Sequence, residues 1–156
     1  MRLHHRRVAA GALLAVFGVL AFVALYFEPQ KLVIDDHVAE RPPVSVVRTL
    51  SSAPFRSYEH ATTGRARVVA TAAGRRYVRF ENFATSNGPA LKVYLSTAPA
   101  TGPAGAFDDR FVDLGDLKGN IGAQNYAIPR DVALAGYRSV VVWCKRFSVP
   151  FGAAAL

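Results

Sequence analysis

One stretch near the start of the chain constrains the fold more than any other feature. From Val8 to Phe27 no residue is charged. As an α-helix this stretch would be about 30 Å long, the thickness of the hydrocarbon core of a bilayer. The string RLHHRR precedes it, and an excess of bases marks the cytoplasmic side of a membrane segment. We therefore expect a single transmembrane anchor at residues 8–27 that contacts the lipid bilayer, with a cytoplasmic tail at residues 1–7.

A cleaved signal peptide is the alternative interpretation of the same stretch. The apolar run is longer than the core of an ordinary signal peptide, and no A-x-A cleavage pattern lies near its end. Val19–Ala21 is the best substitute, but it lies inside the run. Length and cleavage pattern favour the uncleaved anchor. Under both interpretations residues 32–156 are extracytoplasmic. With the favoured anchor, the predicted location is the cell membrane, single-pass, with the N-terminus inside.

The segment after the anchor predicts a spacer. Pro42 and Pro43 favour extended backbone, so residues 28–54 are expected to form an extracytoplasmic spacer before a domain at residues 55–156. The chain has a formal net charge of +8, and its bases are scattered along the predicted domain. A nucleic-acid binder would usually cluster them. We expect a basic surface near an anionic membrane and no nucleic-acid partner.

Short β-like runs separated by turn residues fill the chain after Phe55. In RRYVRFENF, Val78 and Phe80 alternate with charged residues, and LKVYLS alternates in the same way. This period of two is typical of antiparallel strands with one buried and one solvated face. Val140–Trp143 is apolar on both faces, as in a central strand. The predicted strands are ARVVAT, RRYVRFENF, LKVYLS, RFVDL, QNYAI and YRSVVVWCKRF.

The connections between these runs complete the fold prediction. Gly74 marks a hairpin turn, and RDVALAGY could hold one short helical turn. No amphipathic helix of ordinary length follows residue 55. The predicted fold class is all-β: an antiparallel β-sandwich, or a small barrel, preceded by one N-terminal transmembrane helix.

Three loops carry more constrained patterns than ordinary turns. TSNGP combines Asn-Gly, which tolerates positive φ, with a proline. LGDLKGNIGAQNY places three glycines among polar residues, and WCKRFSVPFG holds the only Trp and the only Cys. With their flanking residues, these loops resemble the DM-thirteen domain, the electron-transfer DM family, over roughly residues 56–156. The lead-in PQKLVIDDHV is similar to that of membrane-anchored bacterial members.

The resemblance implies a β-sandwich-like domain, related in role to cytochrome-type redox modules, with one characteristic cysteine. Cys144 matches that cysteine, and Trp143 and Phe147 match its neighbours. The residues that match the polar loop of the family are Gly119, Asn120, Gln124, Asn125 and Tyr126.

Cys144 is the candidate redox residue, and Trp143 and Lys145 complete the candidate site. A thiol next to a base could undergo reversible oxidation. The alternative is a buried strand cysteine that behaves as a small hydrophobe, because Val140, Val142 and Cys144 share one strand face. Exposure of the sulfur distinguishes these interpretations.

The polar loop between Lys118 and Tyr126 is the second candidate site. Its side chains could bind a cofactor, or they could belong to an ordered Ω-like loop whose amides satisfy buried backbone groups. The candidate cofactor-binding residues are Lys118, Asn120, Gln124, Asn125 and Tyr126.

The number of possible ligands disfavours haem and copper. His60 is the only histidine of the predicted domain, the only methionine is residue 1, and C-x-x-C-H is absent. A blue-copper site would require His37, His60 and Cys144 together. The acids between Asp108 and Asp116, with Asn120, could bind a hard cation, but solvated loop acids explain them better. No metal residue is assigned.

Three functional hypotheses follow. No hydrolase, metalloprotease or phosphate-loop motif occurs, which favours an electron-transfer or binding domain over a hydrolase or transferase. The first hypothesis is electron transfer or thiol redox through Cys144 with an unknown partner. The alternative is a non-catalytic cell-surface binding or adhesion module with a structural core cysteine. A metal-dependent scaffold built on the acidic stretch is a third possibility.

Overall fold

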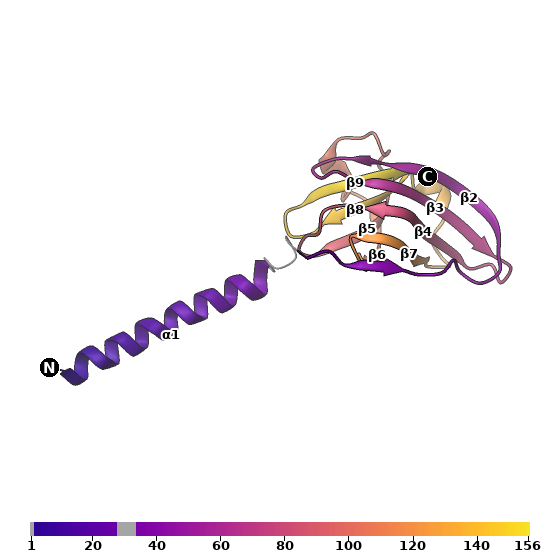
Figure 1. Cartoon of the computed structure of the whole chain (residues 1–156). Coiled ribbons are helices and arrows are strands. Elements are labelled where there is room, and N and C mark those ends of the chain that lie inside the picture. The colour runs from indigo at the N-terminus through magenta and orange to yellow at the C-terminus, as the bar shows by residue number, and fades with distance from the viewer. Residues whose placement is uncertain (1, 28–33) are drawn as a thin grey trace.

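The described residues form one long helix and nine strands (Figure 1). The computed structural model describes the backbone of residues 2–27 and 34–156, and the side chains of residues 13–26 and 34–156. In chain order the elements are α1 (Arg2–Phe27), β1 (His37–Ala39), β2 (Val46–Ser57), β3 (Thr63–Thr71), β4 (Arg76–Ala84), β5 (Leu91–Ser96), the 3-10 turn η2 (Ala104–Ala106), β6 (Phe111–Asp116), β7 (Ile121–Ile128), the 3-10 turn η3 (Leu134–Gly136), β8 (Ser139–Cys144) and β9 (Val149–Ala155).

The uncharged N-terminal stretch is helical, and α1 begins at Arg2, earlier than the predicted start at Val8. Figure 1 shows α1 extending away from the strands. Its described large apolar side chains are exposed, among them Leu13, Leu14, Phe17, Leu20 and Leu25. Across the described residues, no helix is both long enough and apolar enough to cross a membrane.

The strands pair in one continuous sheet in the order β1-β7-β4-β3-β2-β9-β8-β5-β6. The antiparallel prediction holds for every pair but one, because β1 runs parallel to β7. β2 connects the two halves of the sheet. Its residues Val46–Pro54 pair with β3, whereas Phe55–Ser57 pair with β9. Two register shifts interrupt its pairing with β3, and such bulges bend a strand and increase its twist.

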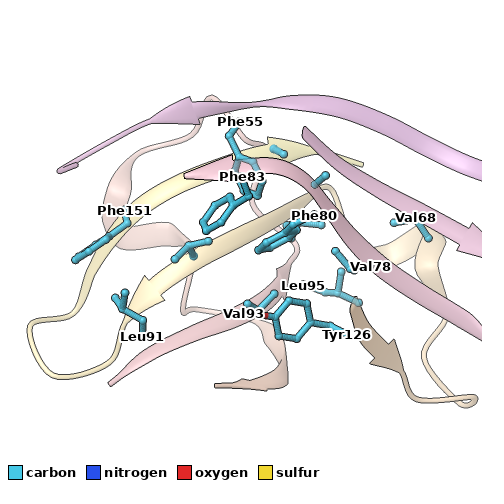
Figure 2. Packing of buried hydrophobic residues seen from close by; sticks show 14 of the residues in the cluster. Phe55, Val68, Val78, Phe80, Phe83, Leu91, Val93, Leu95, Tyr126 and Phe151 are labelled. Atoms are coloured by element: carbon cyan, nitrogen blue, oxygen red, sulfur yellow. The ribbon is translucent and has the colours of Figure 1, made fainter. Parts of the chain in front are cut away.

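This bend curls the sheet so that its halves share one apolar core. Figure 2 shows Phe80 and Tyr126, from β4 and β7, in the same cluster as Val93 and Leu95 from β5. At the far edge, β6 also contacts β7. A single curled sheet therefore takes the place of the two separate sheets of the predicted sandwich.

A second apolar cluster lies on the other face of the β5–β8–β9 half. The chain between β5 and β6 covers this face with Phe107, which packs with Trp143 and Tyr94. Leu91, Val93 and Leu95 face the main core as predicted. However, the face of β5 that was expected to be solvated buries Tyr94 and Ser96. The period of two was correct, but the sequence pattern did not reveal the covering segment.

Each of the six predicted strands overlaps one of the strands β3 to β8, and the turn at Gly74 and the short turn η3 are also present. The spacer prediction is corrected in its described part, because β1 and most of β2 lie within residues 28–54 and belong to the sheet. Residues 28–33 lie outside the described residues. β9, with the sequence VPFGAAA, was not predicted, since its proline, glycine and alanines are weak strand formers.

Candidate functional site

Cys144 is the last residue of β8, and its side chain lies in the main core. The sulfur is completely buried, with an exposed fraction of 0%. Val140 and Val142 belong to the same cluster, so the predicted shared face is confirmed. The thiol donates a hydrogen bond to the carbonyl oxygen of Pro89 at 3.3 Å. These surroundings are those expected of a core cysteine.

Trp143 and Lys145 do not join Cys144 in one site. Trp143 points to the opposite face, where its ring stacks with Tyr94 at a centroid distance of 6.3 Å. Lys145 is exposed, and its backbone N–H donates to the carbonyl of Ala90 at 3.1 Å. Because successive strand residues alternate between faces, neighbours in sequence lie on different sides of the sheet. The three predicted residues are therefore separated.

The loop Thr85–Ala90 covers the sulfur. Pro89 is buried above it, and Ala90 adopts a φ of 53°. Asn87 fixes the loop, since its amide donates to the carbonyl of Ile34 at 2.8 Å and to the carboxylate of Asp36 at 3.0 Å. The positive φ expected within Asn-Gly occurs at Ala90 instead. In this conformation the thiol is closed to solvent, and Pro89 is its hydrogen-bond partner.

The second candidate site is assembled, because the residues of the polar loop meet around β7. Tyr126 donates through its hydroxyl to Oε1 of Gln124 at 2.6 Å and accepts from the backbone N–H of Lys118 at 3.1 Å. Gln124 also donates to the carbonyl of Gly119 at 2.8 Å. Burial raises the pKa of Tyr126, against the opposing effect of the hydrogen bond from Lys118. The phenol is thus held neutral inside the domain.

Asn120 attaches the segment that leads into β1. It is 1% exposed, and its amide donates to the carboxylate of Asp35 at 2.7 Å and to the carbonyl of Thr85 at 2.9 Å. Its oxygen accepts from the backbone N–H of Asp36 at 2.7 Å. Every hydrogen-bonding group of this buried amide is occupied within the chain. Such an amide fixes the backbone and offers nothing to a ligand.

Gly119 and Gly122 let β1 approach this loop. A Cβ on Gly119 would lie 2.5 Å from the carbonyl oxygen of Asp36. A Cβ on Gly122, which has a φ of 109°, would collide with the carbonyl of Val38. The glycines that resemble those of a ligand-binding loop therefore make room for a neighbouring strand.

Glu40 and Arg79 complete this polar network. Glu40 receives hydrogen bonds from Nζ of Lys118 at 2.7 Å and from the backbone N–H of Asn125 at 2.7 Å. Burial alone would raise the pKa of Glu40, but the bonds from Lys118 and Asn125 outweigh it and lower that pKa. Arg79 is 8% exposed and donates to Asn125 and Glu81. Sequence reasoning missed Glu40 because it assigned that residue to the spacer.

The possible metal ligands do not gather. His37 lies in β1, whereas the ring of His60 stacks on Phe151 at a centroid distance of 3.8 Å. Asp113 and Asp116 pair with Lys92. Throughout the described part of the chain, no three His, Cys, Asp or Glu side chains lie where one metal ion could bind them. His37, His60 and Cys144, the three ligands that a blue-copper site would require, do not form such a group.

The comparisons with known proteins agree with the resemblance of the three loops. The family model described as electron transfer DM13 matches residues 54–156, close to the expected 56–156. Neither the curated proteins nor the solved structures contain a match to the chain. Because the family model covers most of the chain, including all strands from β3 to β9, the chain belongs to the electron transfer DM13 family.

Proposed function

We propose that this chain is an electron-transfer domain held at the extracytoplasmic face of a membrane by residues 8–27. Membership of the electron transfer DM13 family is the observation that carries the proposal. The matched region forms most of the curled sheet and both apolar clusters. The family description thus applies to the folded domain and not to the helix.

The side chains of α1 support the membrane part of the proposal. Its large apolar side chains are exposed throughout the described stretch from Leu13 to Leu25. A helix that is apolar all round belongs in a large core or in a membrane, and the described strands do not cover these side chains. The bases before the helix favour a cytoplasmic N-terminus, which would place the sheet outside.

Thiol redox at Cys144 is the finer part of the proposal, and it requires local opening. A partner reaches the sulfur only when Pro89 and Ala90 shift away from it. Ala90 has a φ of 53°, a conformation that residues other than glycine adopt uncommonly. This backbone strain lowers the cost of moving the loop, so Cys144 would react from an open minority state.

Complete burial of Cys144 favours a second candidate function. If the thiol only fills the core, the domain is a non-catalytic binding or adhesion module at the cell surface. Free cysteine often packs as a small hydrophobe. The two candidates differ in whether Cys144 reacts while the domain is folded.

The rate of thiol labelling tests the role of Cys144. We would measure the reaction of the full chain with a chromogenic disulfide reagent, before and after unfolding in guanidinium. Opening of the loop predicts slow labelling at denaturant concentrations far below the unfolding midpoint. Replacing Ala90 with glycine should slow this reaction by relieving the strain that favours opening. Labelling only in step with global unfolding would assign Cys144 to the core and favour the binding module.

A redox titration tests electron transfer itself. The purified full chain would be titrated between dithionite and ferricyanide, with absorption spectra and metal analysis of the same sample. Electron transfer predicts a reversible change with a defined midpoint potential. A chain that exchanges no electrons, with or without a bound metal, contradicts the proposal.

A further inference from the structure

The turn between β8 and β9 combines charge with an exposed aromatic ring. Its residues are Lys145, Arg146, Phe147 and Ser148. Phe147 is 56% exposed, and Lys145 is exposed beside it. Cys144 belongs to the main core, and Val149 packs against it. Phe147 does neither. The turn thus presents the ring of Phe147 and the base of Lys145 to its surroundings.

The same turn contacts the end of α1. The guanidinium carbon of Arg146 lies 4.1 Å from the ring centroid of Tyr26, a close cation–π distance. Tyr26 in turn stacks on Phe22 at a centroid distance of 5.3 Å. Figure 1 shows the yellow turn between β8 and β9 at the end of the sheet from which α1 leaves. Arg146 of the turn therefore lies beside the last residues of the apolar helix.

The pairing register of the strands shows which residues lie at the same end of the sheet as the turn. Leu91 pairs with Cys144, whereas Ser96 pairs with both Ser139 and Phe111. Phe111, which is 40% exposed, consequently lies at the opposite end of β5 from the turn. Phe147 therefore lies at the α1 end of the sheet, and Phe111 lies at the other end.

The two described acids that lie between α1 and β1 bind asparagine side chains. Asp35 accepts from Asn120, and Asp36 accepts from Asn87. Both carboxylates are held by the amides that attach the segment before β1. No ion pair to Lys145 or Arg146 occurs among the described residues. Lys145 is the exposed base of the turn, whereas Nη1 of Arg146 is buried.

We propose that the turn Lys145–Ser148 docks on the surface of a bilayer that contains anionic lipids. This inference rests on the proposed anchoring by residues 8–27. If α1 spans the bilayer, Tyr26 lies at the outer interface, where tyrosine rings are enriched. Arg146 and Lys145 then lie at the level of the phosphates, and Phe147 enters the interface. The turn fixes the orientation of the domain, with the Phe111 end directed away from the membrane.

Tryptophan substitution at Phe147 and Phe111, the exposed phenylalanines of the sheet domain, tests this orientation. Phe147→Trp and the matched control Phe111→Trp would be made in the full chain and reconstituted in phosphatidylcholine vesicles with or without phosphatidylglycerol. A fraction of the acyl chains would be brominated near the headgroup to quench nearby indoles. Trp143 is 2% exposed and provides the same background in both variants.

Docking predicts quenching for Phe147→Trp and not for Phe111→Trp, with more quenching when phosphatidylglycerol is present. Adding Lys145→Gln should shift the docking equilibrium about fivefold, because a base near an anionic surface contributes about 1 kcal/mol. Equal quenching of the two indoles in a chain that floats with its vesicles overturns the docking but leaves the anchor intact. A chain that does not float with vesicles overturns the anchor, and the docking with it.

Discussion

Cys144 of the first candidate site and the amides Gln124 and Asn120 of the second are all buried, but different interactions hold them. Around Cys144 the neighbours are apolar, and one hydrogen bond to Pro89 satisfies the thiol. Around Gln124 and Asn120 the neighbours are polar, and each amide is occupied by backbone or side-chain partners. In the first region van der Waals packing sets the stability. In the second region the stability depends on a hydrogen-bond partner for each polar group. Residues that match the motifs of the family therefore build its fold in two distinct ways.

Removing an aromatic ring from the apolar region should have the largest effect. Phe80 is 0% exposed, and its ring contacts those of Phe55, Phe83 and Tyr126. Phe80→Ala should lower the free energy of unfolding by about 3–5 kcal/mol, since it leaves a cavity that rigid neighbours cannot fill. Guanidinium denaturation followed by emission of Trp143 would measure this. Val44→Ala, at an 86% exposed side chain, should change stability by less than about 0.5 kcal/mol.

Removing an amide from the polar region should cost less, but for a different reason. Gln124→Ala leaves the backbone of Gly119 and the hydroxyl of Tyr126 without their partner. An unsatisfied buried group costs about 1–3 kcal/mol. Combining the change with Tyr126→Phe removes one orphaned group, so the double variant should lose less than the sum of the single ones. Strictly additive losses, measured by denaturation, would contradict the network.

Cys144→Ser introduces a more polar group into the apolar region. The hydroxyl can still donate to Pro89, so the cost should fall near the lower end of about 1–3 kcal/mol. Cys144→Ala removes the donor together with the sulfur and should cost a similar or smaller amount. Unchanged melting of both variants, measured by circular dichroism, would show that the sulfur contributes little to packing.

The smallest effect should come from titrating Glu40. Its pKa is lowered in the folded domain from the ordinary 4.5, so its ionised form stabilises the fold. This contribution is fully present above pH 4.5 and is lost as the pH falls through the lowered value. Glu40→Gln should reduce the difference in unfolding midpoint between pH 6 and about pH 3. An unchanged pH dependence in this variant would exclude Glu40 as a contributor.

The sequence alone determined the strands that obey a local rule. Val78 and Phe80, like Leu91 and Val93, face the core because a period of two places alternate residues on one side of a strand. The hairpin at Gly74 follows from a turn that needs a positive φ, which Gly74 adopts at 71°. The family resemblance also came from the sequence, because it depends on the order and identity of residues.

Only the tertiary structure decided how these strands are covered and joined. Tyr94 has a position that looks solvated, but the chain around Phe107 covers it. Arg79 lies on the charged face of β4, but Glu40 and Asn125 bury it. The exposure of a strand side chain depends on segments that are distant in the chain. A local sequence pattern does not show which segment will pack over it. For the same reason, the sequence could place Cys144 at the end of a strand, but only the loop containing Pro89 determined that its sulfur is buried.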